Sequence, residues 1–150
     1  MKKQLLWVTL AIAVSIPLIT SLSVHSAIPP LSEQKLRERA THIVVGQVTL
    51  IKTREVPVQY GTNYEHIAKV RIERVDKSLS AQLKPGQTIE VHYTTIKDRK
   101  PISPPGSQRQ SRPLAVGTKV KLFLVEREAK RFYLLEPNGW QPHSSSHIKR

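Results

Sequence analysis

The chain has 150 residues, with 24 lysines and arginines against 11 acidic residues, and a formal net charge of +13. Its length suits a single domain, and its apolar content of 39% is too high for a disordered polyelectrolyte. Because there is no cysteine, disulfides, thiolate metal sites, a cysteine nucleophile and a cysteine-linked lipid are all excluded. Composition therefore predicts a basic single-domain protein and leaves its function open.

Residues 1–27 have the layout of a secretory signal peptide. Lys2 and Lys3 precede an apolar run, and no acidic residue occurs before Glu33. Small residues before Ala27 suit cleavage; an uncleaved membrane anchor is the alternative, because the apolar run would span roughly 27 Å as a helix. Removing this segment leaves 22 basic and 11 acidic residues, a net charge of +11. We therefore expect a periplasmic or extracellular protein whose mature chain is basic.

Residues 28–41 are predicted to form an extended segment followed by a short helix. Two prolines keep the first part extended, and Ser32 is placed to cap a helix over residues 33–40. The helix has too few apolar residues to form a core by itself. We expect it to lie as a flap against the rest of the domain.

Residues 42–140 are predicted to form a β domain. Runs of β-branched residues or alternating apolar and polar residues indicate five strands, over residues 42–51, 64–73, 88–94, 119–125 and 131–135. The fold class is therefore mainly β, a five-stranded antiparallel barrel with a short N-terminal helix, since closure removes exposed strand edges. An open β-sandwich is the alternative. Trp140 is expected to cover one end of the barrel, and residues 141–150 to form a disordered tail.

A proline-rich basic loop is predicted over residues 97–113, without regular secondary structure. Its cations are Lys97, Arg99, Lys100, Arg109 and Arg112, and with one aspartate the loop carries a net charge of +4. Since these cations cannot neutralise one another, the loop is expected to present a positive field to an anionic ligand. A solvated loop that only keeps the protein soluble is the alternative.

The order of these features resembles that of small secreted bacterial domains of the OB-like or netrin-like type. The resemblance rests on residues 40–48, residues 70–75, Leu83 to Gly86 before a strand, and residues 134–140. It implies an OB-like barrel. Eukaryotic proteins of that architecture include metalloproteinase inhibitors that act through an N-terminal cysteine, which this chain lacks. Their inhibitory mechanism is therefore not implied here.

Enzyme motifs are missing from the sequence, which has no nucleophile elbow, no His-Glu-x-x-His and no phosphate-binding glycine loop. We therefore expect a non-enzymatic protein without a cofactor or metal. His66 lies in the apolar phase of its strand and is expected to be a hydrogen-bonded core residue, with a ligand-binding role as the alternative. Tyr60 and Tyr64 form a candidate stacking platform for a base or sugar ring, against ordinary packing. His143 and His147 would bind a metal only if the tail were helical.

These features together favour an exported binding module. Its expected partner is an anionic envelope polymer, lipid headgroups or an exported acidic protein, contacted through the basic loop, whereas export argues against cytoplasmic nucleic acid. One alternative is an inhibitor or accessory subunit of an exported enzyme. The other is a small hydrolase built around His66 or His92. The oligomeric state is not predicted.

Overall fold

The computed structural model describes residues 29–80, 82–101, 109–128 and 130–144, which form one helix and six strands. In chain order these are α1 (Glu33–Arg39), β1 (His42–Val58), β2 (Gly61–Ser78), β3 (Thr88–Arg99), β4 (Lys119–Glu128), β5 (Arg131–Leu134) and β6 (Trp140–Pro142). Within these ranges no helix is both long enough and apolar enough to cross a membrane. The predicted signal peptide and residues 145–150 of the predicted tail lie outside the described residues.

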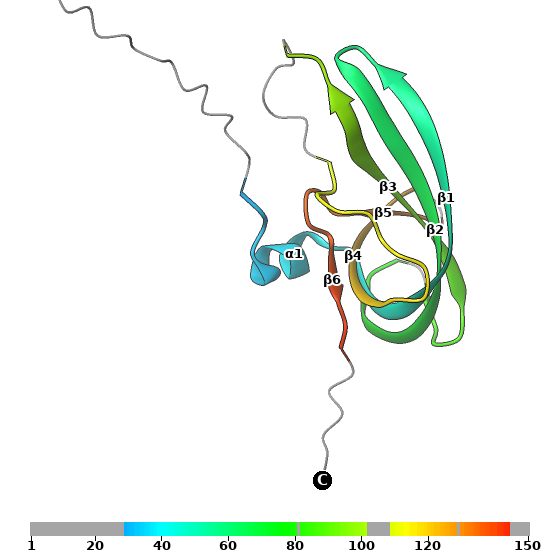
Figure 1. The fold of residues 1–150 in the computed structure, drawn as a ribbon. Helices are drawn as coiled ribbons and strands as arrows, with labels where there is room; N and C mark the ends of the chain where they lie inside the picture. The colour runs from blue at the N-terminus through cyan, green and yellow to red at the C-terminus, as the bar shows by residue number, and fades with distance from the viewer. Residues whose placement is uncertain (1–28, 81, 102–108, 129, 145–150) are drawn as a thin grey trace, which may run out of the picture.

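Strands β1 to β5 form a closed barrel in the order β1-β2-β3-β5-β4, with β4 pairing back to β1 (Figure 1). The mainly β barrel is thus confirmed, but the expectation that it is antiparallel throughout is wrong, because β3 and β5 are parallel. The reason is geometric: strand directions can alternate around a closed ring only if the number of strands is even. Five strands require one parallel pair, and it falls between β3 and β5.

The barrel interior is filled by alternate residues of its strands. The largest buried cluster includes Val44, Val48, Ala68, Val70, Ile72, Val91, Leu122, Leu124 and Phe132. Trp140, on β6, packs against this cluster as well and pairs with Leu122 of β4. Because Gln141 and Pro142 belong to the same strand, the prediction of a disordered tail is wrong at its start. These two residues are held in place because β6 pairs with residues 120–122 of β4, a part of that strand that does not pair with β5.

Helix α1 packs outside the barrel, as the sequence predicts. Leu36 is its buried residue, and it forms a second cluster with Ala40, Ile43, Phe123 and Leu135. The Ser32 side chain accepts a hydrogen bond from the Lys35 amide, which confirms the predicted N-cap. The helix ends at Arg39, one residue earlier than predicted.

The segment before α1 is fastened to the turn between β5 and β6. The Leu31 amide donates to Asn138 Oδ1, and Asn138 Nδ2 donates to the Leu31 carbonyl oxygen, both at 2.9 Å. Lys121 adds an ion pair with Glu33 at 2.9 Å. The two ends of the domain are therefore joined by side chains far apart in sequence.

Strands β1, β2 and β3 continue past the barrel as a three-stranded arm (Figure 1). Strand β1 pairs with β4 only as far as Gln47, whereas its pairing with β2 continues to Val58. The predicted end of the first strand at residue 51 is therefore too early. The basic loop is also shorter than predicted, because Lys97 and Arg99 lie on β3. Cross-strand pairing with β2 holds both extensions, although their own sequences lack a clear apolar alternation.

Candidate functional site

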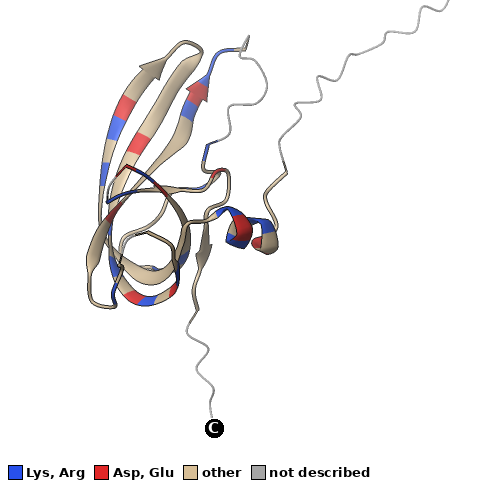
Figure 2. Ribbon diagram, turned by 180° about the vertical axis from the view of Figure 1, so that it is seen from behind, with Lys and Arg blue, Asp and Glu red and all other residues tan. Residues whose placement is uncertain are grey.

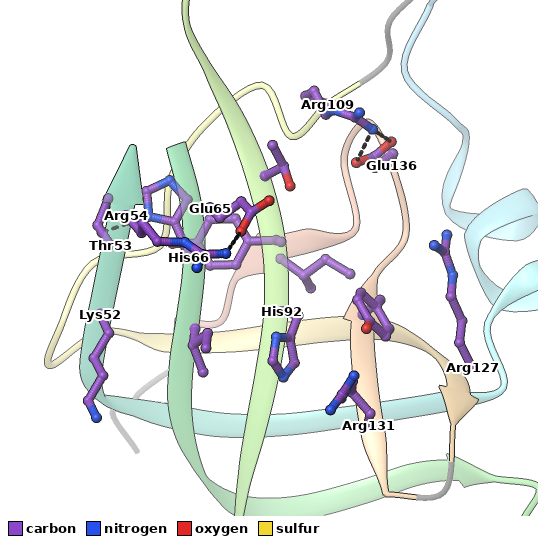
Figure 3. Close-up of a pocket in the computed structure, with 15 residues that line it drawn as sticks. Lys52, Thr53, Arg54, Glu65, His66, His92, Arg109, Arg127, Arg131 and Glu136 are labelled. Atoms are coloured by element: carbon purple, nitrogen blue, oxygen red, sulfur yellow. Dashed lines mark hydrogen bonds and ion pairs between the residues drawn. The ribbon is translucent and has the colours of Figure 1, made fainter. Parts of the chain in front are cut away.

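A cavity of about 620 Å³ lies where the arm leaves the barrel, and we refer to it as the groove (Figure 3). Its lining comes from β1, β2 and β3, from the end of β4, from β5, and from Arg109 and Glu136 outside the strands. The volume is within the usual range for ligand sites in proteins. The groove is therefore large enough to hold part of an extended ligand or all of a small one.

The register of the arm places the groove-lining residues of β1, β2 and β3 in adjacent cross-strand rows. Lys52, Ile67 and His92 occupy directly paired positions on β1, β2 and β3. Thr53, His66 and Tyr93, the adjacent positions, form the next paired row and belong to the opposite side of the sheet. Because Tyr93 belongs to the interior cluster, the row with Lys52 and His92 lies on the outer face of the sheet.

The groove carries an excess of positive charge. Its lining contains five cations, Lys52, Arg54, Arg109, Arg127 and Arg131, and two carboxylates, Glu65 and Glu136, a net charge of +3. Charges of both signs occur along the arm and the barrel (Figure 2). This excess in one concave site would attract an anionic ligand.

Two of the five groove cations make no ion pair within the described residues. Arg54 contacts Glu65 at 2.6 Å, Arg109 contacts Glu136 at 3.4 Å, and Arg131 contacts Glu128 at 2.8 Å. Lys52 and Arg127 have no such partner in the described part of the chain, and Figure 3 shows them on opposite sides of the groove. The groove therefore has two cations, at separate positions, that form no ion pair in the described part of the chain.

An aromatic surface lies between these two cations. The rings of His92 and Tyr133 lie with their centroids 5.3 Å apart, and the guanidinium of Arg127 lies 5.0 Å from the centre of the Tyr133 ring. Burial, with a smaller contribution from Arg131, lowers the pKa of His92. Its imidazole is therefore mainly neutral at pH 7, and offers a flat surface rather than a charge.

Glu136 brings a negative charge into this positive site. Burial raises the pKa of its carboxyl group, although Arg109 and Arg127 act in the opposite direction. The peptide bond that follows it, to Pro137, is cis. Both carboxylate oxygens of Glu136 lie 3.4 Å from the same Arg109 nitrogen, Nη1.

Of the five cations predicted to act together in the basic loop, Arg109 alone lines the groove. Lys97 is ion-paired with Glu55 at 2.7 Å and Arg109 with Glu136 at 3.4 Å, so acidic residues outside the loop offset part of the positive field expected of it. Arg112 lies 5.0 Å from the centre of the Trp140 ring. The Lys97 side chain therefore contacts the arm, and the Arg112 side chain contacts β6.

The remaining predicted site residues lie on the arm. Arg99 donates to Asn63 Oδ1 at 2.6 Å, and the Lys100 amide donates to the carbonyl oxygen of Tyr60 at 2.9 Å. The Lys97 ammonium lies 5.6 Å from the centre of the Tyr64 ring. Of the predicted site residues on the arm, His66 lines the groove, whereas the residues named in this paragraph do not, so the structure separates the two tyrosines from the concave site.

His66 is a hydrogen-bonded core histidine, as the sequence predicts. It is 7% exposed, its Nδ1 and Nε2 lie 2.9 Å and 2.8 Å from the hydroxyls of Thr53 and Thr95, and its ring stacks on Tyr93 at 4.5 Å. Burial lowers its pKa. Among the described residues neither His66 nor His92 hydrogen-bonds to a carboxylate or a serine, the contacts that would favour the hydrolase alternative.

No metal-ligating group of three or more residues occurs in the part of the chain that the structure describes. His143 lies in that part and His147 lies outside it. Sequence reasoning missed Lys52, Arg127 and Tyr133. The available signals were the continued alternation of Lys52 and Arg54 after the first apolar run, and the placing of Arg127 just before the last predicted turn.

No family model, curated protein or solved structure matches this chain.

Proposed function

We propose that this protein is an exported, non-enzymatic OB-like barrel that binds an anionic polymer of the cell envelope in the groove. The observation that carries the proposal is the net charge of +3 in a concave site where Lys52 and Arg127 form no ion pair in the described residues. The strand order β1-β2-β3-β5-β4 supports the OB-like classification. The predicted signal peptide supports export, and the mature net charge of +11 supports an anionic partner.

A polymer with repeated anionic groups suits the groove better than a single small anion. Lys52 and Arg127 come from opposite sides of the site, with the His92 and Tyr133 rings among the lining residues (Figure 3). A sugar phosphate polymer would place one phosphate on each cation and lay a sugar ring on the aromatic surface. The site of contact is thus the groove, and the basic loop contributes through Arg109.

Binding of the purified mature protein to a soluble glycerol phosphate polymer at low ionic strength tests this proposal. Lys52→Ala and Arg127→Ala should each weaken binding about 5-fold, because a cation close to an anionic surface contributes about 1 kcal/mol. Added salt should weaken binding further. Lys35→Ala and Arg39→Ala are matched controls, since they remove the same charges from the exposed face of α1 and should have little effect.

Three outcomes would overturn the proposal. If the control variants weaken binding as much as the groove variants do, net charge and not the groove is responsible. If the protein instead binds phosphatidylglycerol vesicles more tightly than the polymer, lipid headgroups are the ligand and the polymer assignment is wrong. Absence of salt-dependent binding to both probes would exclude a polyanionic ligand altogether.

A further inference from the structure

Arg109 and Glu136 form an ion pair inside the groove that has the features of an exchangeable contact. Both carboxylate oxygens are 3.4 Å from Arg109 Nη1, whereas the Arg54 and Glu65 pair in the same groove is separated by 2.6 Å. Strong charge-assisted hydrogen bonds are about 2.7–2.9 Å long. The longer contact indicates a weaker bond, which a ligand anion with shorter contacts to Arg109 would replace.

The backbone around this pair is held firmly, so exchange would involve side chains rather than a rearranged fold. Gln110, next to Arg109, is 3% exposed. The backbone amide of Gln110 donates to the Thr94 carbonyl oxygen at 2.9 Å, and its side-chain amide donates to the Leu135 carbonyl oxygen at 2.6 Å. Arg109 and Glu136 are thus each adjacent in sequence to a residue in this network, and their relative position is set by it.

We propose that the Glu136 carboxylate occupies the anion subsite of the groove as an internal competitor, and that an anionic ligand must displace it from Arg109 to bind. This inference rests on the proposed function of the groove. It makes Glu136 a selectivity residue, because an anion that bonds poorly to Arg109 does not replace the carboxylate already there. A phosphate group, which presents several oxygens to a guanidinium, is the chemical class best suited to do so.

The same arrangement links binding to pH. The charged groups that act on Glu136 are Arg109, from the segment before β4, and Arg127, on β4; Arg131 and His92 are further titratable groups of the groove lining. Burial makes the Glu136 carboxyl group easier to protonate than an exposed one, despite the two arginines. Protonation removes the competing charge, so ligand affinity should rise as pH falls through the Glu136 pKa.

The test compares Glu136→Gln with the wild-type protein for binding to the glycerol phosphate polymer between pH 8 and pH 4. At pH 8 the variant should bind about 5-fold more tightly, since one opposing charge is removed. The ratio should fall towards one as pH decreases, because the wild-type carboxyl group becomes neutral. His92 is present in both proteins, so its own titration cancels in the ratio.

Glu38→Gln, on the exposed face of α1, is the control for a change in net charge alone. Unfolding curves of each variant confirm that the proteins compared are folded. If Glu136→Gln binds no more tightly than Glu38→Gln at any pH, the inference is overturned. That result is distinct from failure of the proposed function, in which the wild-type protein would not bind at all or would bind independently of Lys52 and Arg127.

Discussion

Replacement of His66 tests whether this residue stabilises the arm or binds a ligand. His66→Phe keeps the stacking on Tyr93 but removes the hydrogen bonds to Thr53 and Thr95. Thr95 is 8% exposed, so water cannot easily replace its lost partner, whereas Thr53 is exposed and can bond to water. A buried polar group without a partner costs about 1–3 kcal/mol. We expect His66→Phe to lower the free energy of unfolding by about 2 kcal/mol.

A double-mutant cycle isolates the bond between His66 and Thr95. Adding Thr95→Val to His66→Phe removes the hydroxyl that the first substitution leaves unpaired. The double variant should therefore be more stable than the sum of the two single effects predicts, by about 1–2 kcal/mol. Thr53→Val is the matched control and should couple to His66→Phe by less than about 0.5 kcal/mol. Urea unfolding followed by circular dichroism measures all of these values.

The structural assignment of His66 fails under either of two results. If the effects of His66→Phe and Thr95→Val simply add, the buried hydrogen bond does not contribute as argued. If His66→Phe abolishes binding of the anionic polymer while the free energy of unfolding is unchanged, His66 is a ligand-binding residue.

Two further predictions concern stability. Burial lowers the pKa of His42, His66 and His92 in the folded protein, so the unfolded chain takes up protons first as pH falls below about 6.5. The free energy of unfolding should therefore decrease by up to about 1.4 kcal/mol per pH unit for each histidine. His92→Gln should reduce this dependence on pH. If His92→Gln leaves the pH dependence of the free energy of unfolding unchanged, the lowered pKa of His92 does not contribute to that dependence. A Cβ at Gly139 would lie 2.3 Å from the Leu135 carbonyl oxygen, so Gly139→Ala should lower the free energy of unfolding by about 2–3 kcal/mol. Thermal unfolding measures this effect, and an unchanged melting temperature would contradict the close approach.

Local patterns predicted the secondary structure better than the pairing of the strands. The cap at Ser32 placed the start of α1 correctly, and runs of β-branched or alternating residues located part of each barrel strand. The parallel contact between β3 and β5 leaves no mark in either strand, because it follows from closing a ring of five. The ends of β1 and β3 were underestimated because their pairing with β2, and not their own apolar content, holds them in place.

The candidate site was predicted less well than the fold, and for a similar reason. A cluster of cations is visible in the sequence over residues 97–112, but the acidic partners of Lys97 and Arg109 are distant in sequence. Lys52 and Arg127 are also distant from each other in sequence and meet in one groove only through the strand order. Sequence patterns show where charge is concentrated along the chain, whereas pairing decides which charges remain uncompensated.

The bond between Leu31 and Asn138 has a consequence for how the chain acquires its native structure. These residues are separated by 107 positions, and the apolar partners of α1 include Phe123 and Leu135 near the C-terminus. During synthesis the helix is therefore made long before the surface that it covers exists. Contacts between segments so distant in sequence close a long loop and form slowly. We expect α1 to dock in the last stage of folding, and a chain truncated before residue 123 to leave its apolar face exposed.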